Sequence, residues 1–432
     1  MVITYYWPPS GGISVHRSLK IVKYLRKFGW EPVVYTAKNA DYPYHDEGNY
    51  KDIPENLEVI KRPILEPFRV FKILSGRKKN EPLNNIVHVR DRKRSIIEEL
   101  SIWIRGNFFI PDARSLWIRP SVKFLLKYLK KHPVDAIFAD GPPHTNTRIA
   151  THLAKELNIP FLADFQDPWT QVDYYQHMKI TKWADKIHRR MELELFQTAD
   201  KITIASPTWK MELENIGAKN VDVVYYGYDE DDFKNLTQKL DEKFSIVHTG
   251  LLGYDRNPRN LFQACKELSE ENDSFRNDLE LKFAGQIDYS VVESIIEHNL
   301  NNNFLNLGTI SRQQALQLTL NAQLLLLPLN ISKNIKGRMP GKFYEYLRAG
   351  RPIINIGPED SDVGRIVNKN KCGIVVDYKE IASLKKFISN NYEKYKNKNI
   401  EGCKEIFLEF SVENQTQKIA KYLNEITLNE KQ

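Results

Sequence analysis

The chain has 432 residues, a length typical of two or three domains with complete hydrophobic cores. Its 41% apolar and 27% charged residues exclude a disordered, collagen-like or disulfide-stapled protein, and its three cysteines are too far apart to predict a zinc site. The formal net charge is +8, from 63 basic and 55 acidic residues, and no apolar run approaches the roughly 18 residues of a membrane span. Because the N-terminus also lacks the pattern of a signal peptide, we expect a cytoplasmic protein.

The first half of the chain alternates short apolar runs with amphipathic helical patterns, which is typical of parallel strands joined by crossover helices. We predict strands at residues 2–6, 31–36, 56–61, 136–139, 161–165 and 201–205. We predict helices at residues 14–28, 121–131, 147–157 and 183–199. This order of elements predicts a Rossmann-like sheet.

The alternation stops after residues 221–224, in an aromatic and then acidic stretch, and it restarts near Phe244. We therefore predict one domain at residues 1–228 and a second at 229–432. The second domain is predicted to have strands at 245–249, 279–284, 304–307, 324–327, 352–356 and 373–376. Its predicted helices lie at 257–269, 291–298, 312–321, 342–348, 363–368 and 412–426.

The predicted fold class is α/β, with two doubly wound Rossmann-like domains facing a central cleft. The last helix follows a completed second core, so two placements stay open for it: on the second domain, or back on the first. Ligands of open parallel sheets bind at the carboxyl ends of the strands. The loops that follow strands are therefore the places to look for chemistry.

Two of these loops combine glycine with a feature that attracts anions. The loop after the first strand contains Gly11 and Gly12 just before a helix, and paired glycines let the backbone approach an anionic ligand. The loop at 249–257 combines Gly250 with Arg256, whose guanidinium can hold phosphate oxygens in a fork. The alternatives are a plain tight turn for the first loop and a solvated arginine for the second.

The segment 337–352 carries the strongest local signal. Gly341 opens a short helix whose N-terminus offers amide groups and a partial positive charge, and Lys342 adds a full charge. Glu345 follows one helical turn later, so its carboxylate lies on the same helix face as Lys342. A cation for a diphosphate beside a carboxylate for two ribose hydroxyls suits a nucleotide sugar. The alternative is a surface ion pair between the two side chains.

Polar residues also follow two neighbouring strands of the first domain. Asp140 and His144 come after the strand at 136–139, and Asp164 and Asp167 come at the end of the strand at 161–165. An acceptor or a general base would lie at such strand ends. For His144 a structural or solvated role is the alternative.

The basic excess of the chain lies in residues 61–131, which contain 18 Lys and Arg against 6 Asp and Glu, or +12, leaving −4 (8 − 12) for the rest. Clusters at 77–79 and 90–94 are interleaved with Phe68, Phe71 and Leu74. Such a pattern is typical of surfaces that bind anionic lipid or polyphosphate. A solvated lysine-rich face is the alternative.

Five segments, taken together, identify a family. They are Pro8-Pro9-Ser10-Gly11-Gly12, Ile110-Pro111-Asp112-Ala113, Gly141-Pro142-Pro143-His144, 163–169 (Ala-Asp-Phe-Gln-Asp-Pro-Trp) and 341–346 (Gly-Lys-Phe-Tyr-Glu-Tyr). In this order they resemble family 4 glycosyltransferases of the GT-B fold, and more narrowly the bacterial branch that builds surface polysaccharides. The resemblance covers nearly the whole chain, and the joint occurrence is more specific than any single motif.

The resemblance implies a retaining, metal-independent transferase that uses a nucleotide-diphosphate sugar and needs no cofactor. It implies that Glu345 binds the ribose hydroxyls, that Arg256 and Lys342 bind the diphosphate as catalytic groups, and that His144 is a further catalytic candidate. The other implied residues bind the nucleotide sugar (Gly11, Gly12, Gly250, Thr309, Ile310 and Gly341) or lie on the acceptor side (Asp140, Asp164 and Asp167). Two departures stand out: Gly337 replaces a glutamate that the family often has eight positions before Glu345, and Gln166 replaces an arginine.

We therefore predict a hexosyl- or N-acetylhexosaminyltransferase of capsule or O-antigen synthesis, with a UDP-sugar as the favoured donor. The expected acceptor is a glycan on a polyprenyl diphosphate, and the expected location is the anionic inner face of the plasma membrane, without nucleic acid as a partner. Two alternatives stay open. One is a nucleotide-sugar 2-epimerase of the same fold, and the other is a non-catalytic subunit that binds a nucleotide sugar.

Overall fold

The computed structural model describes residues 1–66, 96–400, 402–403 and 407–429, and it divides into two compact units. The first unit comprises Met1–Tyr226 and Val412–Gln432, and the second unit comprises Gly227–Ser411. The predicted second domain, 229–432, differs from this division at its end, because the last helix belongs to the first unit.

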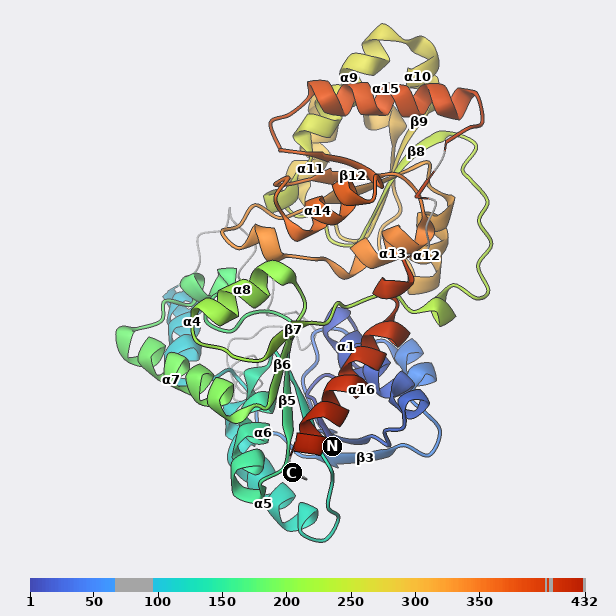
Figure 1. Cartoon of the computed structure of the whole chain (residues 1–432). Helices are drawn as coiled ribbons and strands as arrows, with labels where there is room; N and C mark the ends of the chain where they lie inside the picture. The colour runs from blue at the N-terminus through green and yellow to red at the C-terminus, as the bar shows by residue number, and fades with distance from the viewer. Residues whose placement is uncertain (67–95, 401, 404–406, 430–432) are drawn as a thin grey trace. The chain divides into compact units, whose positions relative to one another are not determined.

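The first unit is built on a parallel sheet whose strand order is β3-β2-β1-β4-β5-β6-β7 among the described residues. The strands are β1 (Val2–Ile3), β2 (Val33–Ala37), β3 (Glu58–Arg62), β4 (Ile137–Gly141), β5 (Phe161–Phe165), β6 (Lys201–Ile204) and β7 (Val221–Val223). The helices are α1 (Ile13–Leu25), α4 (Ile96–Phe108), α5 (Ile118–Leu129), α6 (His144–Leu157), α7 (Lys182–Thr198), α8 (Pro207–Asn215) and α16 (Val412–Asn429) (Figure 1). The order reverses between β1 and β4, so the loops after these two strands border the switch point where such sheets bind ligands.

The second unit repeats the same principle with strand order β10-β9-β8-β11-β12-β13 in the part described. Its strands are β8 (Phe244–Thr249), β9 (Leu279–Ala284), β10 (Phe304–Asn306), β11 (Leu324–Pro328), β12 (Ile353–Ile356) and β13 (Gly373–Val376). Its helices are α9 (Arg259–Glu271), α10 (Asp273–Asp278), α11 (Tyr289–Glu297), α12 (Arg312–Asn321), α13 (Gly341–Ala349), α14 (Asp362–Lys369) and α15 (Ala382–Lys396). The switch point lies between β8 and β11, beside the loops that precede α9 and α13.

The predicted α/β class with two doubly wound parallel sheets is confirmed. The helices α4, α8, α10 and α15 were not predicted. The strand predicted at 2–6 is shorter in the structure, where β1 spans only Val2–Ile3.

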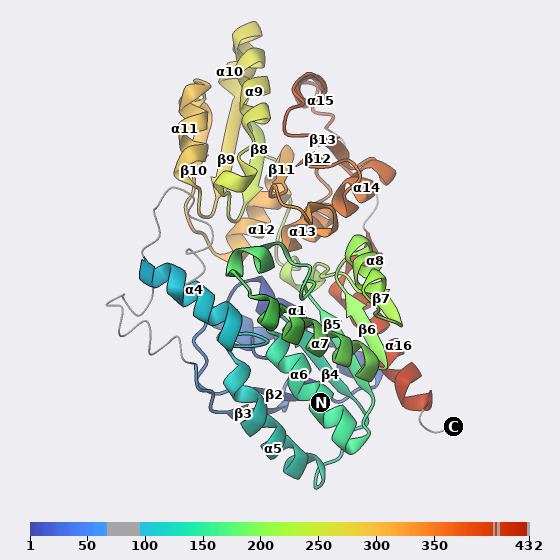
Figure 2. The same ribbon diagram turned by 90° about the vertical axis from the view of Figure 1, so that its left-hand side faces the viewer.

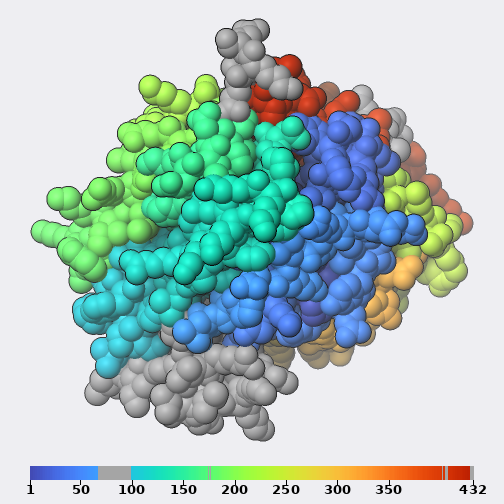
Figure 3. All heavy atoms as spheres, turned by 90° about the horizontal axis from the view of Figure 1, so that it is seen from below, coloured from blue at the N-terminus to red at the C-terminus, as the bar shows by residue number. Residues whose placement is uncertain are grey.

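Alternating side chains of the central strands fill two cores, one on each face of the first sheet. Ile3 and Ala139 lie in one cluster, whereas their chain neighbours Val2 and Phe138 lie in the other. Both faces of a parallel sheet are covered by helices, so its strands read as continuous apolar runs. Seen from below in Figure 3, segments from the N-terminus (blue) and from residues 100–200 (cyan to green) lie side by side on this unit.

The C-terminal helix α16 packs against α1 within the first unit (Figure 1). Its buried residues Ile419 and Leu423 join the cluster that contains Val15 and Leu19 of α1. Polar contacts fix its position, since the Trp30 indole donates to Asn424 over 2.9 Å and Gln415 accepts from the backbone amide of Tyr225. Of the two placements left open by the sequence, the structure shows the second.

This packing predicts that Ile419→Ala lowers the free energy of unfolding of the first unit by about 2–5 kcal/mol, because the side chain is fully buried and leaves a cavity. Lys421→Ala on the same helix is the matched control, since its side chain is 72% exposed. Urea unfolding, followed by circular dichroism, measures both. Equal stability of the two variants would contradict the packing of α16 on this core.

Candidate functional site

Lys342 lies in the first turn of α13, at the carboxyl edge of the second sheet. The helix begins after Pro340, and neither a capping side chain nor an acidic residue of its own first turn neutralises its N-terminal amides in the part described. These amides and the Lys342 ammonium together present positive charge in one place. The surface ion pair between Lys342 and Glu345, the alternative that the sequence left open, is not formed among the described residues, because each side chain has a different partner.

The partner of Lys342 is His248, on β8. The ammonium donates to His248 Nε2 over 3.2 Å, and His248 Nδ1 donates in turn to the carbonyl of Leu326 on β11 over 3.0 Å. Burial and the charge of Arg256 lower the pKa of Lys342 and Glu345 acts in the opposite direction, which together place this pKa at about 7. The hydrogen bond to His248 therefore orients the Lys342 amine without neutralising its charge, because the imidazole is itself neutral. That charge is available to an anion.

Gly250, directly after β8, makes room for the same ammonium. Its backbone φ is +100°, and a Cβ added there would lie 2.9 Å from Lys342 Nζ. The next strand imposes a second close approach, since the Gly250 amide donates to Ala284 over 2.7 Å and a Cβ on Gly285 would meet the Gly250 carbonyl. Glycine at 250 is thus favoured by the positive φ, and a side chain there would displace the Lys342 amine.

Arg256 lies in the same loop, in the short 3₁₀ turn Tyr254–Arg256. Its guanidinium pairs with Asp255 through Nε at 3.1 Å and Nη2 at 3.2 Å, and its side chain is 20% exposed. Arg256 and Lys342 influence one another electrostatically, since the arginine lowers the pKa of the lysine. The two cations predicted to meet a diphosphate therefore lie near one another.

Glu345 is held by Arg312, the first residue of α12. Arg312 Nη1 lies 2.8 Å from Glu345 Oε1, and Nη2 lies 3.0 Å from Asp232 Oδ2. Burial lowers the pKa of Arg312, but the charges of Glu345 and Asp232 outweigh it and raise that pKa overall. Arg312 was missed by the sequence reasoning, although its place after the Ser311 cap marked it as the start of a helix.

The remaining candidates of the second unit surround this edge. Thr309 is exposed and Ile310 is half-buried in the loop between β10 and α12, where the Gly308 carbonyl accepts from Gly285 over 2.7 Å. Gly341 is the first residue of α13. Gly337, where the family often has glutamate, is buried at the end of a 3₁₀ turn.

In the first unit, Gly11 and Gly12 form the turn between β1 and α1. The Gly11 amide donates to the Tyr44 carbonyl over 2.8 Å, and Gly12, with φ +81°, precedes the first helical residue, Ile13. Within the described part of the chain, α1 has neither a side-chain cap nor an acidic residue in its first turn. The edge of this unit therefore also ends in a helix N-terminus open to an anion.

Asp140 is fully buried and accepts four hydrogen bonds. The donors are Thr4 Oγ1 at 3.1 Å, Ser18 Oγ at 2.8 Å, Asn146 Nδ2 at 2.8 Å and Gln166 Nε2 at 3.1 Å. Burial raises its pKa to about 7. With no exposed surface, Asp140 joins α1 and α6 to the residues that directly follow β1 and β5 rather than facing an acceptor.

Asp164 forms a buried ion pair with Arg17 of α1. Two contacts of 2.6 Å join the guanidinium to the carboxylate, whose Oδ1 also accepts from Thr203. Arg17 reaches onward to the Tyr225 carbonyl at 3.0 Å. Asp167 is half-buried in the next loop. Burial raises the pKa of Tyr226, and the charge of Asp167 raises it further.

His144 is the first residue of α6 and lies flat against Trp169, with ring centroids 4.4 Å apart and an interplanar angle of 5°. Burial lowers its pKa to about 3, so the ring is neutral, and its Nδ1 has no hydrogen-bond partner among the described residues. Asp112 supports the same helix start, accepting from the Thr145 amide and hydroxyl at 2.8 and 2.9 Å. The ring packs the start of α6, and a catalytic role for His144 stays a prediction.

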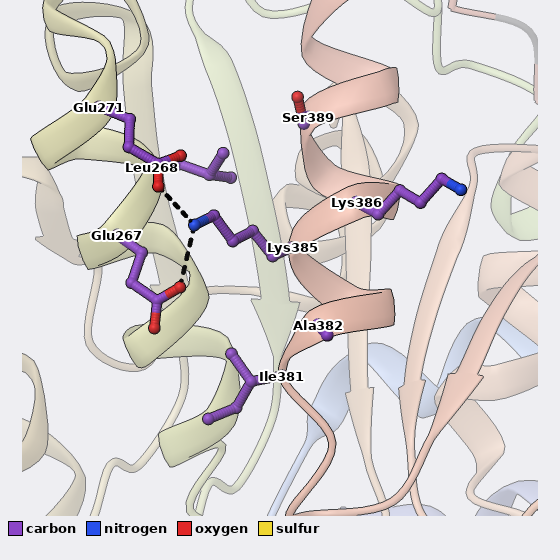
Figure 4. A pocket seen from close by; sticks show the side chains of 8 residues that line it. All are labelled: Glu267, Leu268, Glu271, Ile381, Ala382, Lys385, Lys386 and Ser389. Carbon is purple, nitrogen blue, oxygen red and sulfur yellow. Dashed lines mark hydrogen bonds and ion pairs between the residues drawn. The ribbon is translucent and has the colours of Figure 1, made fainter.

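A shallow surface hollow lies elsewhere in the second unit, between α9 and α15 (Figure 4). Lys385 spans it and pairs with Glu267 at 3.0 Å and Glu271 at 2.7 Å. These charges satisfy one another, and none of the predicted site residues lines the hollow. We assign it no ligand.

Part of the predicted basic segment 61–131 cannot be placed. Residues 67–95, with the clusters at 77–79 and 90–94 and with Phe68, Phe71 and Leu74, lie outside the described residues. Among the helices that are described, none is both long and apolar enough to cross a membrane.

Two family models match this chain. Glycosyltransferase Family 4 matches residues 10–232, about half of the chain, and Glycosyl transferases group 1 matches residues 229–402. No curated protein sequence matches. Together the models cover all the predicted site residues and every strand of the two described sheets except β1.

Solved structures with a similar fold include three enzymes or complexes at low identity. Anabaena HepE in complex with UDP has a TM-score of 0.58 and 12% identity, covering 99% of this chain and 96% of that one. The trehalose-phosphate synthase of Burkholderia xenovorans in complex with glucose-6-phosphate has a TM-score of 0.57 and 10% identity, covering 98% of this chain and 99% of that one. WaaG, a glycosyltransferase involved in lipopolysaccharide biosynthesis, has a TM-score of 0.50 and 12% identity, covering 99% of this chain and 97% of that one. These neighbours confirm the predicted GT-B fold.

The lowered pKa of Lys342 predicts proton uptake on nucleotide binding. A bound diphosphate favours the charged amine and raises its pKa, so binding above pH 7 takes up a proton, and affinity falls as pH rises from 7 to 9. Calorimetry at pH 8 in buffers of different ionisation enthalpy measures the uptake. Lys342→Met should abolish the part due to this group; unchanged uptake in the variant would contradict the assignment.

The space around Gly250 predicts that Gly250→Ala displaces the Lys342 amine and weakens nucleotide binding. Gly29→Ala is the matched control, because Gly29 has φ +83° with nothing within 4 Å of an added Cβ. Both variants should lose about 1–3 kcal/mol of stability from the positive φ. Thermal denaturation and nucleotide titration compare them; equal affinity in both would show that the close approach is unimportant.

Proposed function

The chain belongs to Glycosyltransferase Family 4, and from that membership we propose that it moves a sugar, with retention of configuration, onto a lipid-linked glycan of a bacterial surface polysaccharide. That it is a glycosyltransferase using a nucleotide sugar follows from the family. The retaining mechanism, the acceptor and the polysaccharide are the proposal. In it the second unit binds the donor, and the first unit binds the acceptor.

The observation that carries the donor assignment is the environment of Lys342. Its ammonium, the uncapped N-terminus of α13 and Arg256 gather at the switch point of the second sheet. An anionic ligand would supply the counter-charge that the neutral His248 does not. A diphosphate fits that requirement, because it offers several oxygens to an arginine fork and to helix amides.

The nucleoside follows from the same helix. Glu345 is half-buried and held by Arg312, so its carboxylate is fixed in direction before a ligand arrives. A fixed carboxylate can accept hydrogen bonds from both hydroxyls of a ribose. The loop with Thr309 and Ile310 would meet the base through its backbone. UDP is the proposed carrier, and the complex of HepE with UDP supports that choice.

The proposed reaction exchanges one bond at the anomeric carbon for another on the same face. The bond from the sugar to the diphosphate oxygen breaks, the bond to the acceptor hydroxyl forms, and the hydroxyl proton passes to the leaving diphosphate. The task of the protein is then to stabilise that developing charge. Arg256, Lys342 and the amides of α13 would do so, with no side chain needed as a base.

The acceptor side rests on the first unit. Asp140 and Asp164 are too deeply buried to touch an acceptor, so we propose that they position the loops after β4 and β5. The open N-terminus of α1 at Gly12 would meet an anionic part of the acceptor or of the donor. A polyprenyl diphosphate carries such a group, and WaaG supports the assignment to surface polysaccharide. The enzyme would then work as a peripheral protein on the cytoplasmic face of the plasma membrane.

The experiment that tests this function is an incubation with radiolabelled nucleotide sugars, with and without a polyprenyl-diphosphate-linked acceptor. Label that moves to lipid only when the acceptor is present supports the proposal, and nuclear magnetic resonance of the product reports the anomeric configuration. Conversion to an epimer of the donor would indicate the 2-epimerase. Binding without turnover of any donor would indicate a non-catalytic subunit.

The role of Glu345 predicts that Glu345→Gln weakens UDP binding about tenfold or more, because a charged acceptor of ribose hydrogen bonds is lost. The preference for UDP over its 2′-deoxy analogue should fall as well. Glu297→Gln is the matched control, since Glu297 also pairs with an arginine, Arg259, at 2.6 Å but lies on α11. Calorimetry measures the affinity of both ligands for the unaltered chain and for the two variants; an unchanged preference in Glu345→Gln would contradict the ribose contact.

A further inference from the structure

Helix α4 exposes a stripe of apolar side chains. Leu100, Ile104 and Phe108, spaced four residues apart, lie on one side of the helix and are 53%, 36% and 64% exposed. Trp103, 37% exposed, borders the stripe and meets the Phe108 ring edge-on at 5.6 Å. Large apolar side chains gathered in this way are uncommon on a surface that meets only water.

Gly106 and Asn107 are the residues through which α4 packs on the protein near the start of α7. A Cβ on Gly106 would lie 2.7 Å from the Met178 carbonyl, and Asn107 donates to the Lys179 carbonyl and accepts from the Thr181 amide. Thr181 caps the start of α7, so the two helices meet at this point. Gly106 lies on the side of α4 opposite Ile104, whereas Asn107 lies next to Leu100 and Trp103, so the exposed apolar stripe borders the contact with residues 178–181.

Helix α7 exposes a basic face beside α4. Lys182, Lys186 and Arg190, spaced four residues apart, are exposed and form no ion pair within the described part of the chain. The first turn of the same face adds Trp183, which is 62% exposed. Figure 2 shows both helices on the side of the first unit that faces the viewer.

The acidic residues of α7 do not neutralise this face. Asp185 pairs with Arg189 at 2.9 Å, and Glu194 pairs with Arg148 and Lys155, both at 2.9 Å. Glu192 is buried against Thr170. The charge of Lys182, Lys186 and Arg190 therefore remains for an external partner.

We propose that α4 and α7 form a docking surface for an anionic phospholipid membrane. The α4 stripe would enter the boundary between headgroups and acyl chains, with Trp103 and Trp183 at headgroup level, where tryptophan is favoured. Lys182, Lys186 and Arg190 would pair with lipid phosphates. The inference deepens the proposed function, on which it rests for the reason to be at a membrane, by naming the surface that reaches a lipid-linked acceptor.

The combination of groups favours a membrane over the other polyanions. A nucleic acid or a free polyphosphate would engage the basic face and leave the α4 stripe in water. A bilayer with anionic lipid satisfies both faces, because it offers phosphates and hydrocarbon within a few ångströms of one another. The apolar stripe is thus the feature that separates the two kinds of partner in an experiment.

The test uses the full chain and sedimentation with vesicles of phosphatidylglycerol and phosphatidylcholine, or of phosphatidylcholine alone. We expect binding to the anionic vesicles, and at least a tenfold lower partition coefficient for two multiple variants. The apolar variant is Leu100→Ser, Ile104→Ser and Phe108→Ser, and the charge variant is Lys182→Glu, Lys186→Glu and Arg190→Glu. Brominated lipid should quench tryptophan emission, and Trp103→Phe with Trp183→Phe should remove most of that quenching.

Matched controls test whether vesicle binding depends on this surface, and not on the net charge or the exposed apolar area of the chain in general. Lys38, Lys219 and Lys421 are exposed elsewhere on the first unit and outside the basic segment 61–131, and their joint change to Glu alters the net charge equally. Met211 is 51% exposed on α8, and Met211→Ser removes apolar surface elsewhere on the unit. Both controls should bind as the unaltered chain does. Equal losses in controls and surface variants would overturn the proposal, and so would unchanged binding of the apolar variant.

Two further readouts keep the outcomes distinct. Thermal unfolding establishes that each variant is folded. Transfer to a water-soluble acceptor should be unchanged in the surface variants, because none of their residues belongs to the donor site. Vesicle binding without transfer to any acceptor would refute the proposed function and leave the docking surface standing. Transfer without vesicle binding would support the proposed function and refute the docking surface.

Discussion

The buried ion pair between Arg17 and Asp164 holds together the carboxyl edge of the first sheet. Arg17 comes from α1, Asp164 ends β5, Thr203 of β6 donates to the same carboxylate, and the guanidinium also reaches the Tyr225 carbonyl. A charge placed this deep is tolerated only when its partners are complete, and removing one partner of such a pair typically costs about 3–5 kcal/mol. The geometry of the loops around Gly12 and Gln166 depends on this requirement.

Gln166, which stands where the family resemblance predicts an arginine, also satisfies buried polar partners at this edge. Its amide donates to Asp140 at 3.1 Å, and its carbonyl accepts from Tyr226 at 2.8 Å. Tyr226 also lies beneath Arg17, whose guanidinium is 5.2 Å from its ring. A neutral side chain that both donates and accepts can join a carboxyl group to a phenol, which an arginine cannot do because it only donates. The substitution is therefore consistent with its neighbours.

The fold could be predicted from sequence because buried parallel strands leave a strong local signal. Runs such as 161–165 and 279–284 are mostly apolar and lie between amphipathic segments, and the structure has strands with the same bounds. The missed helices had weaker signals. Ser206 and Pro207 are a typical cap and first turn for α8, but only Trp209 and Leu213 are buried there. The return of α16 to the first unit depends on apolar residues of α1 that are about 400 positions away.

The candidate site was predictable where its residues are close in sequence, as for Gly341, Lys342 and Glu345. The residues that orient these side chains could not be predicted, because they come from other strands and helices. His248 lies 94 residues from Lys342, and Arg312 lies outside every motif. Nothing in a single sequence tells a histidine on a buried strand from one that orients a lysine. Similarly, His144 reads as a reactive loop residue until Trp169 is seen against its ring.

The two carboxyl edges differ in how completely their charges are satisfied. In the first unit Arg17 has a carboxylate and Asp140 has four donors, so the buried groups are saturated within the protein. In the second unit Arg256 pairs with Asp255, but the hydrogen-bond partner of the Lys342 ammonium is a neutral imidazole, and the pKa of Lys342 is lowered to about 7. An edge with uncompensated positive potential gains more from an anion than an edge that is already neutralised. The same electrostatic argument that explains the satisfied charges of the first unit therefore supports the proposal that the second unit stabilises a leaving diphosphate.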